Sequence, residues 1–243
     1  MPRIFSPRHE LVRRFIVGGF VASFPIAALL VRTFPFAAIA IVAISHGAFW
    51  YATLCPNSAF CVPVIKKFAA RGREIWLTFD DGPDPRTTPQ VLELLAGHGA
   101  CATFFLVGES AEKHPALVRQ ILAEGHGIGN HTYAHPKIFF WAYPPSRCGR
   151  EIDRCADVLA AMAGQTPHLF RAPLGLHTPL LLPELMRRGL QPVGWTARGL
   201  DCAVRNPRRV VRRLLSRLEP GAIFMLHPER REKNGLGAGL LAL

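Results

Sequence analysis

The feature that most constrains the fold is an alternation of short apolar runs with longer amphipathic stretches, which begins at Glu74. The apolar runs predict strands over residues 75–79, 101–107, 126–130, 168–171, 190–195 and 221–226. The stretches between them predict helices over residues 88–98, 111–124, 147–163, 178–188 and 207–218. Such alternation is typical of parallel sheets and (β/α) barrels. Because about 150 residues are fewer than the ~250 of a complete eight-fold barrel, the sequence predicts a distorted, incomplete (β/α) barrel in the α/β class.

The N-terminal quarter of the chain is apolar in a different way. It contains two uncharged stretches, Phe15–Val31 and Phe34–Leu54, which are separated by Arg32. A membrane-spanning helix needs about 20 apolar residues, so the first stretch is marginal and the second is long enough. We therefore expect a transmembrane helical segment or hairpin before the barrel.

Three interpretations of this segment stay open. A secretory signal fits poorly, because the apolar region is long and Leu54-Cys55 offers no convincing cleavage context. A single span with an interfacial first segment would place the barrel outside the membrane. A hairpin that turns at Arg32-Thr33 would return the chain to the cytoplasm, and the basic residues on both sides of the hairpin favour it. We expect anchoring in the inner (cytoplasmic) membrane and leave the side of the barrel open.

The same patterns divide the chain into four parts. We predict a basic segment and transmembrane hairpin over residues 1–54, a basic linker over 55–73, the barrel domain over 74–228 and a short tail over 229–243.

The charge balance predicts an anionic partner. The chain carries 29 Lys and Arg against 17 Asp and Glu, a formal net charge of +12. No stretch alternates basic and aromatic residues, so nucleic acid is not the expected partner. The predicted helix 207–218 carries arginines on one face, among them Arg208 and Arg212. This face fits an ordinary solvated surface as well as contact with anionic lipid.

Two adjacent carboxylates, Asp80 and Asp81, follow the first apolar run, and Gly82-Pro83 then breaks the strand. Such a pair is most often a surface turn. If both side chains turn into one site, however, their repulsion has to be offset by a cation or an arginine.

Later strand ends supply candidates for that role. His131 and His135 are four residues apart, so their ring nitrogens can reach one metal ion together with an oxygen of Asp81. Three protein ligands leave one coordination position open, which is typical of a catalytic rather than a structural zinc site. Arg171, at the end of the fourth apolar run, could bind a carboxylate through two nitrogens.

Polar residues also follow the last two runs, namely Asp201 and His227. Each alone would most often be structural. Together with the earlier residues they place polar groups at or near most of the strand ends, which is where α/β folds carry their active sites.

These motifs resemble, in order and spacing, the five motifs of the polysaccharide deacetylase family, the NodB-homology carbohydrate esterases. They are TFDDGP at residues 78–83, HTYAH at 131–135, RAPLG at 171–175, Asp201, and Met225-Leu226-His227. The resemblance covers roughly residues 72–228. It implies a distorted (β/α) barrel and a divalent metal, most often Zn²⁺, with Co²⁺ or another divalent ion also possible.

The resemblance further implies the roles of the site residues. Asp81, His131 and His135 would be the metal ligands, and Asp80 the general base that Arg171 orients. His227 would be the general acid, which Asp201 tunes.

The resemblance also implies the residues that bind the substrate and the oxyanion. They are Leu174, through its backbone N–H, together with Pro173 and Met225. The sequence departs from the family at a few of these positions. Leu174 stands where Tyr is frequent, Met225 where Leu is usual, and Cys202 where Trp often follows the fourth motif.

The function implied is metal-dependent removal of an N-acetyl (or N-formyl) group from an amino sugar in a polysaccharide or glycan. Two alternatives stay open: a deacetylase or deformylase of a lipid-linked sugar, and a catalytically silent, glycan-binding membrane module.

Overall fold

The computed structural model describes residues 5–137, 139–200 and 206–227. Its centre is a sheet of seven strands in the order β5-β4-β3-β2-β1-β7-β6, and every neighbouring pair is parallel. The strands are β1 (Trp76–Asp80), β2 (Ala102–Leu106), β3 (Gly127–Asn130), β4 (Leu169–Phe170), β5 (Gln191–Pro192), β6 (Ala197–Arg198) and β7 (Ile223–Leu226).

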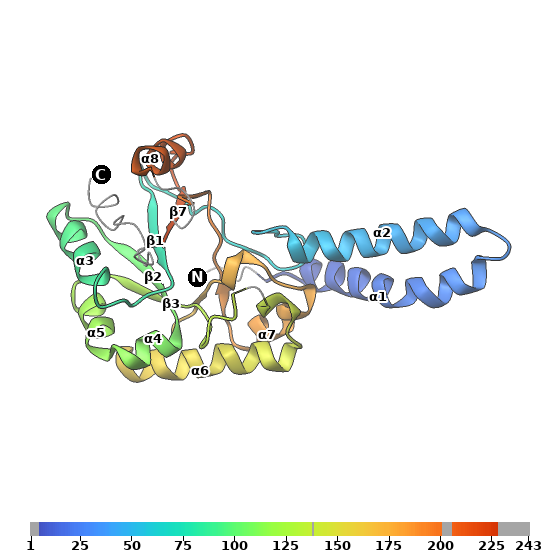
Figure 1. Ribbon diagram of the computed structural model, residues 1–243, viewed down its shortest axis with the longest axis horizontal. Coiled ribbons are helices and arrows are strands. Elements are labelled where there is room, and N and C mark those ends of the chain that lie inside the picture. The colour runs from blue at the N-terminus through green and yellow to red at the C-terminus, as the bar shows by residue number, and fades with distance from the viewer. Residues whose placement is uncertain (1–4, 138, 201–205, 228–243) are drawn as a thin grey trace.

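The sheet curls but does not close, because β5 and β6 are its two edges and do not pair with each other. This confirms the prediction of a distorted, incomplete barrel. The helices α3 to α8 connect the strands and cover the outside of the sheet (Figure 1). They are α3 (Thr88–Gly97), α4 (Gly108–Lys113), α5 (Pro115–Ala123), α6 (Pro145–Ala163), α7 (Leu182–Arg187) and α8 (Pro207–Leu215).

The structure differs from the predicted elements in two places. The helix expected over residues 111–124 is broken into α4 and α5 at His114, because proline at position 115 disfavours the helical conformation of the residue before it. The strand β6 was not predicted, since its two residues are too few to show a periodic pattern.

The two faces of β1 are separated as its alternation predicts. Leu77 and Phe79 pack outward against the helices, in the largest apolar cluster. Trp76 packs inside the curled sheet, in a smaller cluster with Phe105 and Ile223. Asp80 lies on the same face of β1 as Trp76 and Thr78. Its side chain is therefore directed into the barrel, at the carboxyl end of the strand.

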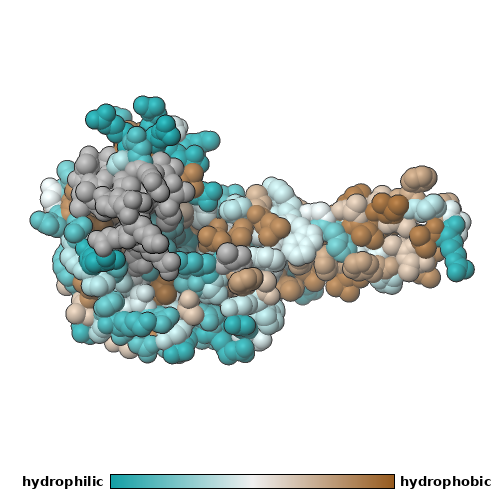
Figure 2. Space-filling model, viewed as in Figure 1, coloured by the Kyte–Doolittle hydropathy of each residue, from teal (hydrophilic) through white to brown (hydrophobic). Residues whose placement is uncertain are grey.

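The N-terminal segment forms an antiparallel helical hairpin that projects from the barrel (Figure 1). Helix α1 (Pro7–Leu30) and helix α2 (Pro35–Leu54) are joined by a turn at residues 31–33, which confirms the predicted hairpin turn. His46, in the middle of α2, packs against Phe20 of α1 with their tilted rings 4.3 Å apart between centroids. Figure 2 shows hydrophobic residues along the hairpin and hydrophilic residues at its tip.

Both helices are long and apolar enough to cross a membrane. At about 1.5 Å per residue, the 24 residues of α1 and the 20 residues of α2 match the ~30 Å of a bilayer's hydrocarbon core. Their most apolar stretches are only 6% and 22% buried, which is unlike the core helix of a soluble protein.

Residues 55–73, predicted as a linker, pack against the barrel. Ile65 forms a bridge with Val193 beside β5, and Lys67 forms a bridge with Ala222 just before β7. These residues therefore cross the gap that the open sheet leaves between its edge strands.

Two sets of predicted residues remain to be placed. Arg208 and Arg212 are exposed on α8, which lies apart from the hairpin in Figure 1. Asp201, Cys202 and the predicted tail over residues 229–243 lie outside the described residues.

The close packing inside the barrel can be tested at Gly129 in β3. A Cβ atom at this position would lie 2.6 Å from two ring atoms of Phe105, which is fully buried. We expect Gly129→Ala to lower the free energy of unfolding by about 1–3 kcal/mol, because the ring has no free space into which to move. Thermal unfolding of the full chain in detergent measures this.

The matched control is Gly97→Ala at the end of α3, where a Cβ atom meets nothing within 4 Å. Alanine there should leave stability unchanged or raise it slightly. Equal melting temperatures for both variants would contradict the packing described for β3.

Candidate active and metal site

The candidate site lies where the carboxyl ends of the parallel strands meet. Asp80 ends β1, His131 directly follows β3, Arg171 directly follows β4 and His227 directly follows β7. The sequence predicted each of these residues, and the sheet order brings them to one edge of the barrel. Ligands and catalytic groups of α/β folds gather at this edge.

Arg171 and Asp80 form an ion pair inside the barrel. The two side chains are 1% and 3% exposed, and Nη1 of Arg171 donates to Oδ1 of Asp80 at 2.5 Å. The predicted two-nitrogen contact is not formed, because Nη1 alone reaches the carboxylate and also donates to the hydroxyl of Thr78 at 2.8 Å.

The other guanidinium nitrogens of Arg171 bind the backbone. Nε donates to the carbonyl of Val193 and Nη2 to that of Gly194, at 3.1 and 2.8 Å. The guanidinium also lies over the ring of Phe105, 4.1 Å from its centroid. Burial lowers the pKa of Arg171, and Asp80 opposes that shift. Each guanidinium nitrogen of Arg171 thus has a hydrogen-bond partner. Arg171 in turn holds one oxygen of Asp80 in place.

Asp81, His131 and His135 form a second cluster beside this pair. Oδ1 of Asp81 lies 3.5 Å from Nε2 of His131 and 3.2 Å from Nε2 of His135. The potential ligand atoms of the three residues all lie within 4.8 Å of one another. Oδ1 of Asp81 is nevertheless buried without a hydrogen-bond partner. Two imidazoles and one carboxylate that converge in this way fit a divalent metal ion.

The electrostatics of the cluster suit metal binding. Burial would raise the pKa of Asp81, but His131, His135 and His227 outweigh it and hold the pKa well below its usual range. Burial and the neighbouring His131 lower the pKa of His135 to about 3. At neutral pH the carboxylate is therefore ionised and His135 is neutral, as metal ligands have to be.

The end of β2 holds the two ligand-bearing loops together. The N–H of Val107 donates to the carbonyl of Gly82, and the N–H of His131 donates to the carbonyl of Leu106, at 2.9 and 3.0 Å. Nδ1 of His131 donates to the carbonyl of Arg171 at 2.7 Å, so Nε2 is left to face Asp81.

Residues that the sequence did not single out shape the loop of His131 and His135. The side chain of Asn130 is fully buried; it accepts from the N–H of Thr132 at 2.9 Å and donates to the carbonyl of Ile152 at 2.8 Å. Thr132 and His135 both adopt positive φ, at 69° and 47°. An asparagine directly before the histidine motif was the available sign of such a turn.

Tyr133, between the two histidines, points away from the metal cluster. Its hydroxyl donates to Glu112 at 2.5 Å and accepts from Arg154 at 2.7 Å. The guanidinium of Arg154 also stacks on the ring at 3.6 Å from its centroid. The tyrosine thus anchors the loop to α4 and α6, which no sequence pattern indicated.

The remaining predicted residues lie around this centre. His227 is partly buried and interacts electrostatically with Asp81 and His135. Leu174 is 51% exposed with φ of 56°, while Pro173 and Met225 are buried. Asp201 lies outside the described residues.

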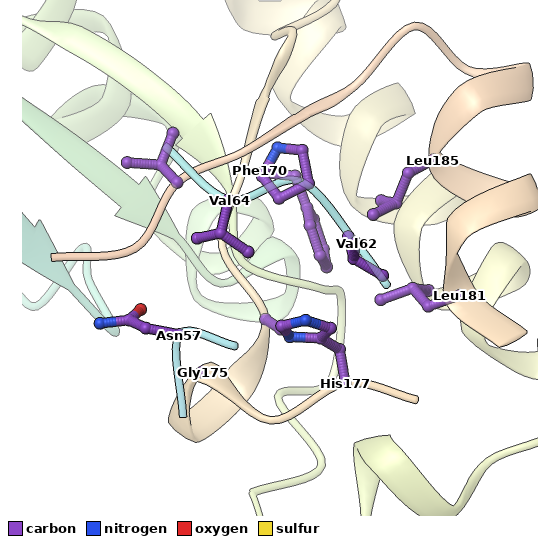
Figure 3. Close-up of a pocket in the computed structure, with 11 residues that line it drawn as sticks. Asn57, Val62, Val64, Phe170, Gly175, His177, Leu181 and Leu185 are labelled. Carbon is purple, nitrogen blue, oxygen red and sulfur yellow. The ribbon is translucent and has the colours of Figure 1, made fainter. Parts of the chain in front are cut away.

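A small apolar pocket lies next to the site but is distinct from it (Figure 3). Phe170, Leu181 and Leu185 line it, together with Asn57 and His177. None of its lining residues belongs to the ion pair or to the metal cluster. The pocket marks where residues 57–64 pack against the outer side of β4.

Known proteins match most of the barrel. The family model for polysaccharide deacetylase matches residues 68–193. A chitooligosaccharide deacetylase of Azorhizobium caulinodans is 36% identical over 160 residues, which cover 63% of this chain and 72% of that protein. A peptidoglycan-N-acetylglucosamine deacetylase of Bacillus cereus is 36% identical over 154 residues, which cover 63% of this chain and 55% of that protein. A solved structure of a peptidoglycan N-acetylglucosamine deacetylase aligns with a TM-score of 0.66 at 32% identity, over 73% of this chain and 82% of that one.

The metal cluster leads to a direct prediction. We expect His131→Ala to lose most of the bound divalent metal, because it removes one of three converging ligands and leaves Asp81 with a single imidazole. The metal content of full-length protein loaded with zinc, measured by mass spectrometry after desalting, tests this.

The control is His98→Ala, which removes an exposed imidazole at the end of α3. It should keep the metal content of the wild type. Full zinc occupancy in a folded His131→Ala protein would show that the ligand assignment is wrong.

Proposed function

The chain belongs to the polysaccharide deacetylase family, and from that premise we propose that it removes an N-acetyl (or N-formyl) group from an amino sugar of a glycan. The observation that carries this proposal is the juxtaposition of a buried carboxylate held by Arg171 and a partly buried cluster of three potential ligands next to it. Hydrolysis of an amide needs a base, an electrophile and an acid, and this edge of the barrel offers all three.

Asp80 is the proposed general base. Its carboxylate takes a proton from the attacking water while the water oxygen bonds to the amide carbon. Arg171 holds one carboxylate oxygen, so the other is free to face that water. A divalent ion bound by Asp81, His131 and His135 would polarise the amide carbonyl and lower the pKa of the water.

His227 is the proposed general acid. It donates a proton to the amide nitrogen as the C–N bond breaks, so the products are acetate (or formate) and the free amino sugar. We propose that Asp201 keeps this imidazole protonated and that the backbone N–H of Leu174 stabilises the oxyanion. Leu174 stands at the exposed rim of the site, while the buried Pro173 and Met225 form part of its wall.

We propose Zn²⁺ as the ion, because two imidazoles and a carboxylate with an open position form a donor set that zinc prefers. Co²⁺ binds the same donor types and would be expected to replace it.

We further propose that the hairpin anchors the enzyme in the inner (cytoplasmic) membrane. Both ends of the hairpin are basic, and the turn contains Arg32 as its single charge. By the positive-inside rule, the N-terminus and the barrel would both face the cytoplasm. The contact of Arg208 and Arg212 with anionic lipid is a separate proposal, since α8 lies apart from the hairpin.

The chemistry is tested by Asp80→Asn. Asn can still accept a hydrogen bond from Arg171 but cannot act as a base, so we expect acetate release to fall by about 10²–10⁴-fold with the metal retained. Acetate released from tetra-N-acetylchitotetraose by the zinc-loaded full chain in detergent measures this.

The matched control is Asp157→Asn on the exposed side of α6, which should keep wild-type activity. If the metal-loaded, folded wild type releases nothing from any amide-bearing sugar, the chain is better described as a silent glycan-binding module.

The topology is tested by a reporter fused after Leu243, together with an epitope inserted after Thr33. We expect cytoplasmic fluorescence from the reporter and periplasmic exposure of the epitope, because a hairpin places its tip across the membrane from both ends. Periplasmic phosphatase activity after Leu243 would contradict the hairpin orientation.

A further inference from the structure

The carboxyl ends of the parallel strands, where Asp80, His131 and Arg171 lie, are here called the catalytic edge. The helical hairpin joins the barrel at this edge. Phe5, just before α1, packs against an apolar cluster that includes Phe140 and Ala172. Ala172 directly follows Arg171, and Phe140 begins the short helix η1 (Phe140–Ala142), which follows His135 in the chain. Both α1 and α2 also contact η3 (Pro179–Leu181), in the loop that leaves β4. The loops that carry the site residues are therefore the loops that hold the hairpin.

The segment that connects α2 to the barrel is bound to the barrel and does not form a flexible tether. Asn57 donates from its backbone to Gly175 at 3.4 Å and from its side chain to the carbonyl of Trp195 at 3.1 Å. Cys61 and Val62 are buried, and Ile65 is bridged to Val193. An anchored enzyme with a flexible tether can reach a polymer away from the bilayer. This barrel is held at the base of its anchor.

Aromatic side chains lie near that base. They are here called the aromatic collar, which consists of Phe60, Tyr51, Trp50, Trp141 and Phe139. The rings of Tyr51 and Phe60 and those of Trp50 and Trp141 meet edge to face, at 6.2 and 6.0 Å.

The collar exposes apolar area to the surroundings. Tyr51 is 60% exposed, Phe60 45% and Phe139 64%. Trp and Tyr side chains concentrate at the level of lipid headgroups, because their rings are apolar and their polar atoms can still bind water. Phe139 and Trp141 belong to the barrel, in the loop that follows His135, so the collar includes residues of both the hairpin and the barrel.

We propose that the collar docks the catalytic edge on the bilayer surface, and that the substrate is an N-acylated amino sugar joined to a membrane lipid. This inference rests on the proposed deacetylase function and names its substrate class. A lipid-linked sugar lies at the headgroup level, where the fixed hairpin and the collar hold the site. A soluble glycan is not concentrated at that level.

The docking has a direct spectroscopic test. Full-length protein is placed in vesicles of phosphatidylcholine and phosphatidylglycerol that contain lipid brominated near the glycerol backbone. In a Trp50→Phe variant we expect tryptophan fluorescence to be quenched through Trp141, and adding Trp141→Phe should remove that quenching. An unquenched Trp50→Phe variant would overturn the docking.

The substrate class is tested in the same vesicles with two acetylated substrates. One is N-acetylglucosamine joined to a long alkyl chain, and the other is soluble tetra-N-acetylchitotetraose. At equal bulk concentration we expect deacetylation of the lipid-linked sugar to be at least about tenfold faster, because the membrane confines both reactants to one surface.

Phe139→Ser should lower turnover of the lipid-linked sugar by about tenfold and leave the soluble substrate unaffected, since it removes an apolar contact with the bilayer. Leu218→Ser is the matched control, because it removes another exposed apolar side chain, 52% exposed, outside the collar. It should change neither rate.

Failure of the lipid-linked substrate and failure of the proposed deacetylase function give different results. Equal rates on both substrates, or faster turnover of the soluble one, would overturn the lipid-linked substrate and keep the deacetylase. No turnover of either substrate by folded, metal-loaded protein would overturn the proposed function and this inference with it.

Discussion

The buried ion pair between Arg171 and Asp80 is the interaction on which the site depends. A guanidinium that is 1% exposed costs several kcal/mol unless its charge and its N–H groups are satisfied. The barrel supplies a carboxylate and a hydroxyl from β1 and two backbone carbonyls that follow β5. The pair therefore joins strands that are three positions apart in the sheet order, and it fixes Asp80, the proposed base, next to the cluster of Asp81, His131 and His135.

The metal cluster depends on the strand between its two contributing loops. Asp81 follows β1 and the histidines follow β3, so β2 separates them in the sheet. The end of β2 bonds to both loops, through Leu106 and Val107. Behind the loop, Asn130 and Tyr133 bind α6 and α4. Three ligands from two loops can converge because both loops are fixed to the same sheet end.

The hairpin packs directly against the loops at the catalytic edge. Residues 55–73 cross the opening of the sheet instead of hanging free, and the pocket of Figure 3 lies where they meet β4. The membrane anchor that we propose would, attached in this way, set the height and the direction of the site above the bilayer. In a protein with a flexible tether, the same apolar helices would say nothing about where the substrate lies.

The sequence by itself determined the fold class, the hairpin turn at Arg32-Thr33 and the residues that the sheet brings together. The hydrophobic period, the residue types at the strand ends and the order of the motifs are all visible in the linear sequence. The strand β6 and the split of the 111–124 helix needed the structure, because two residues are too few to show a period and a period does not show a break at a single residue. Only the tertiary structure decided that Arg171 binds Asp80 through one nitrogen and that residues 55–73 pack on the barrel. It also decided that the hairpin joins the barrel at the catalytic edge. These are contacts between residues far apart in the chain, and packing selects among the many pairings that one sequence pattern allows.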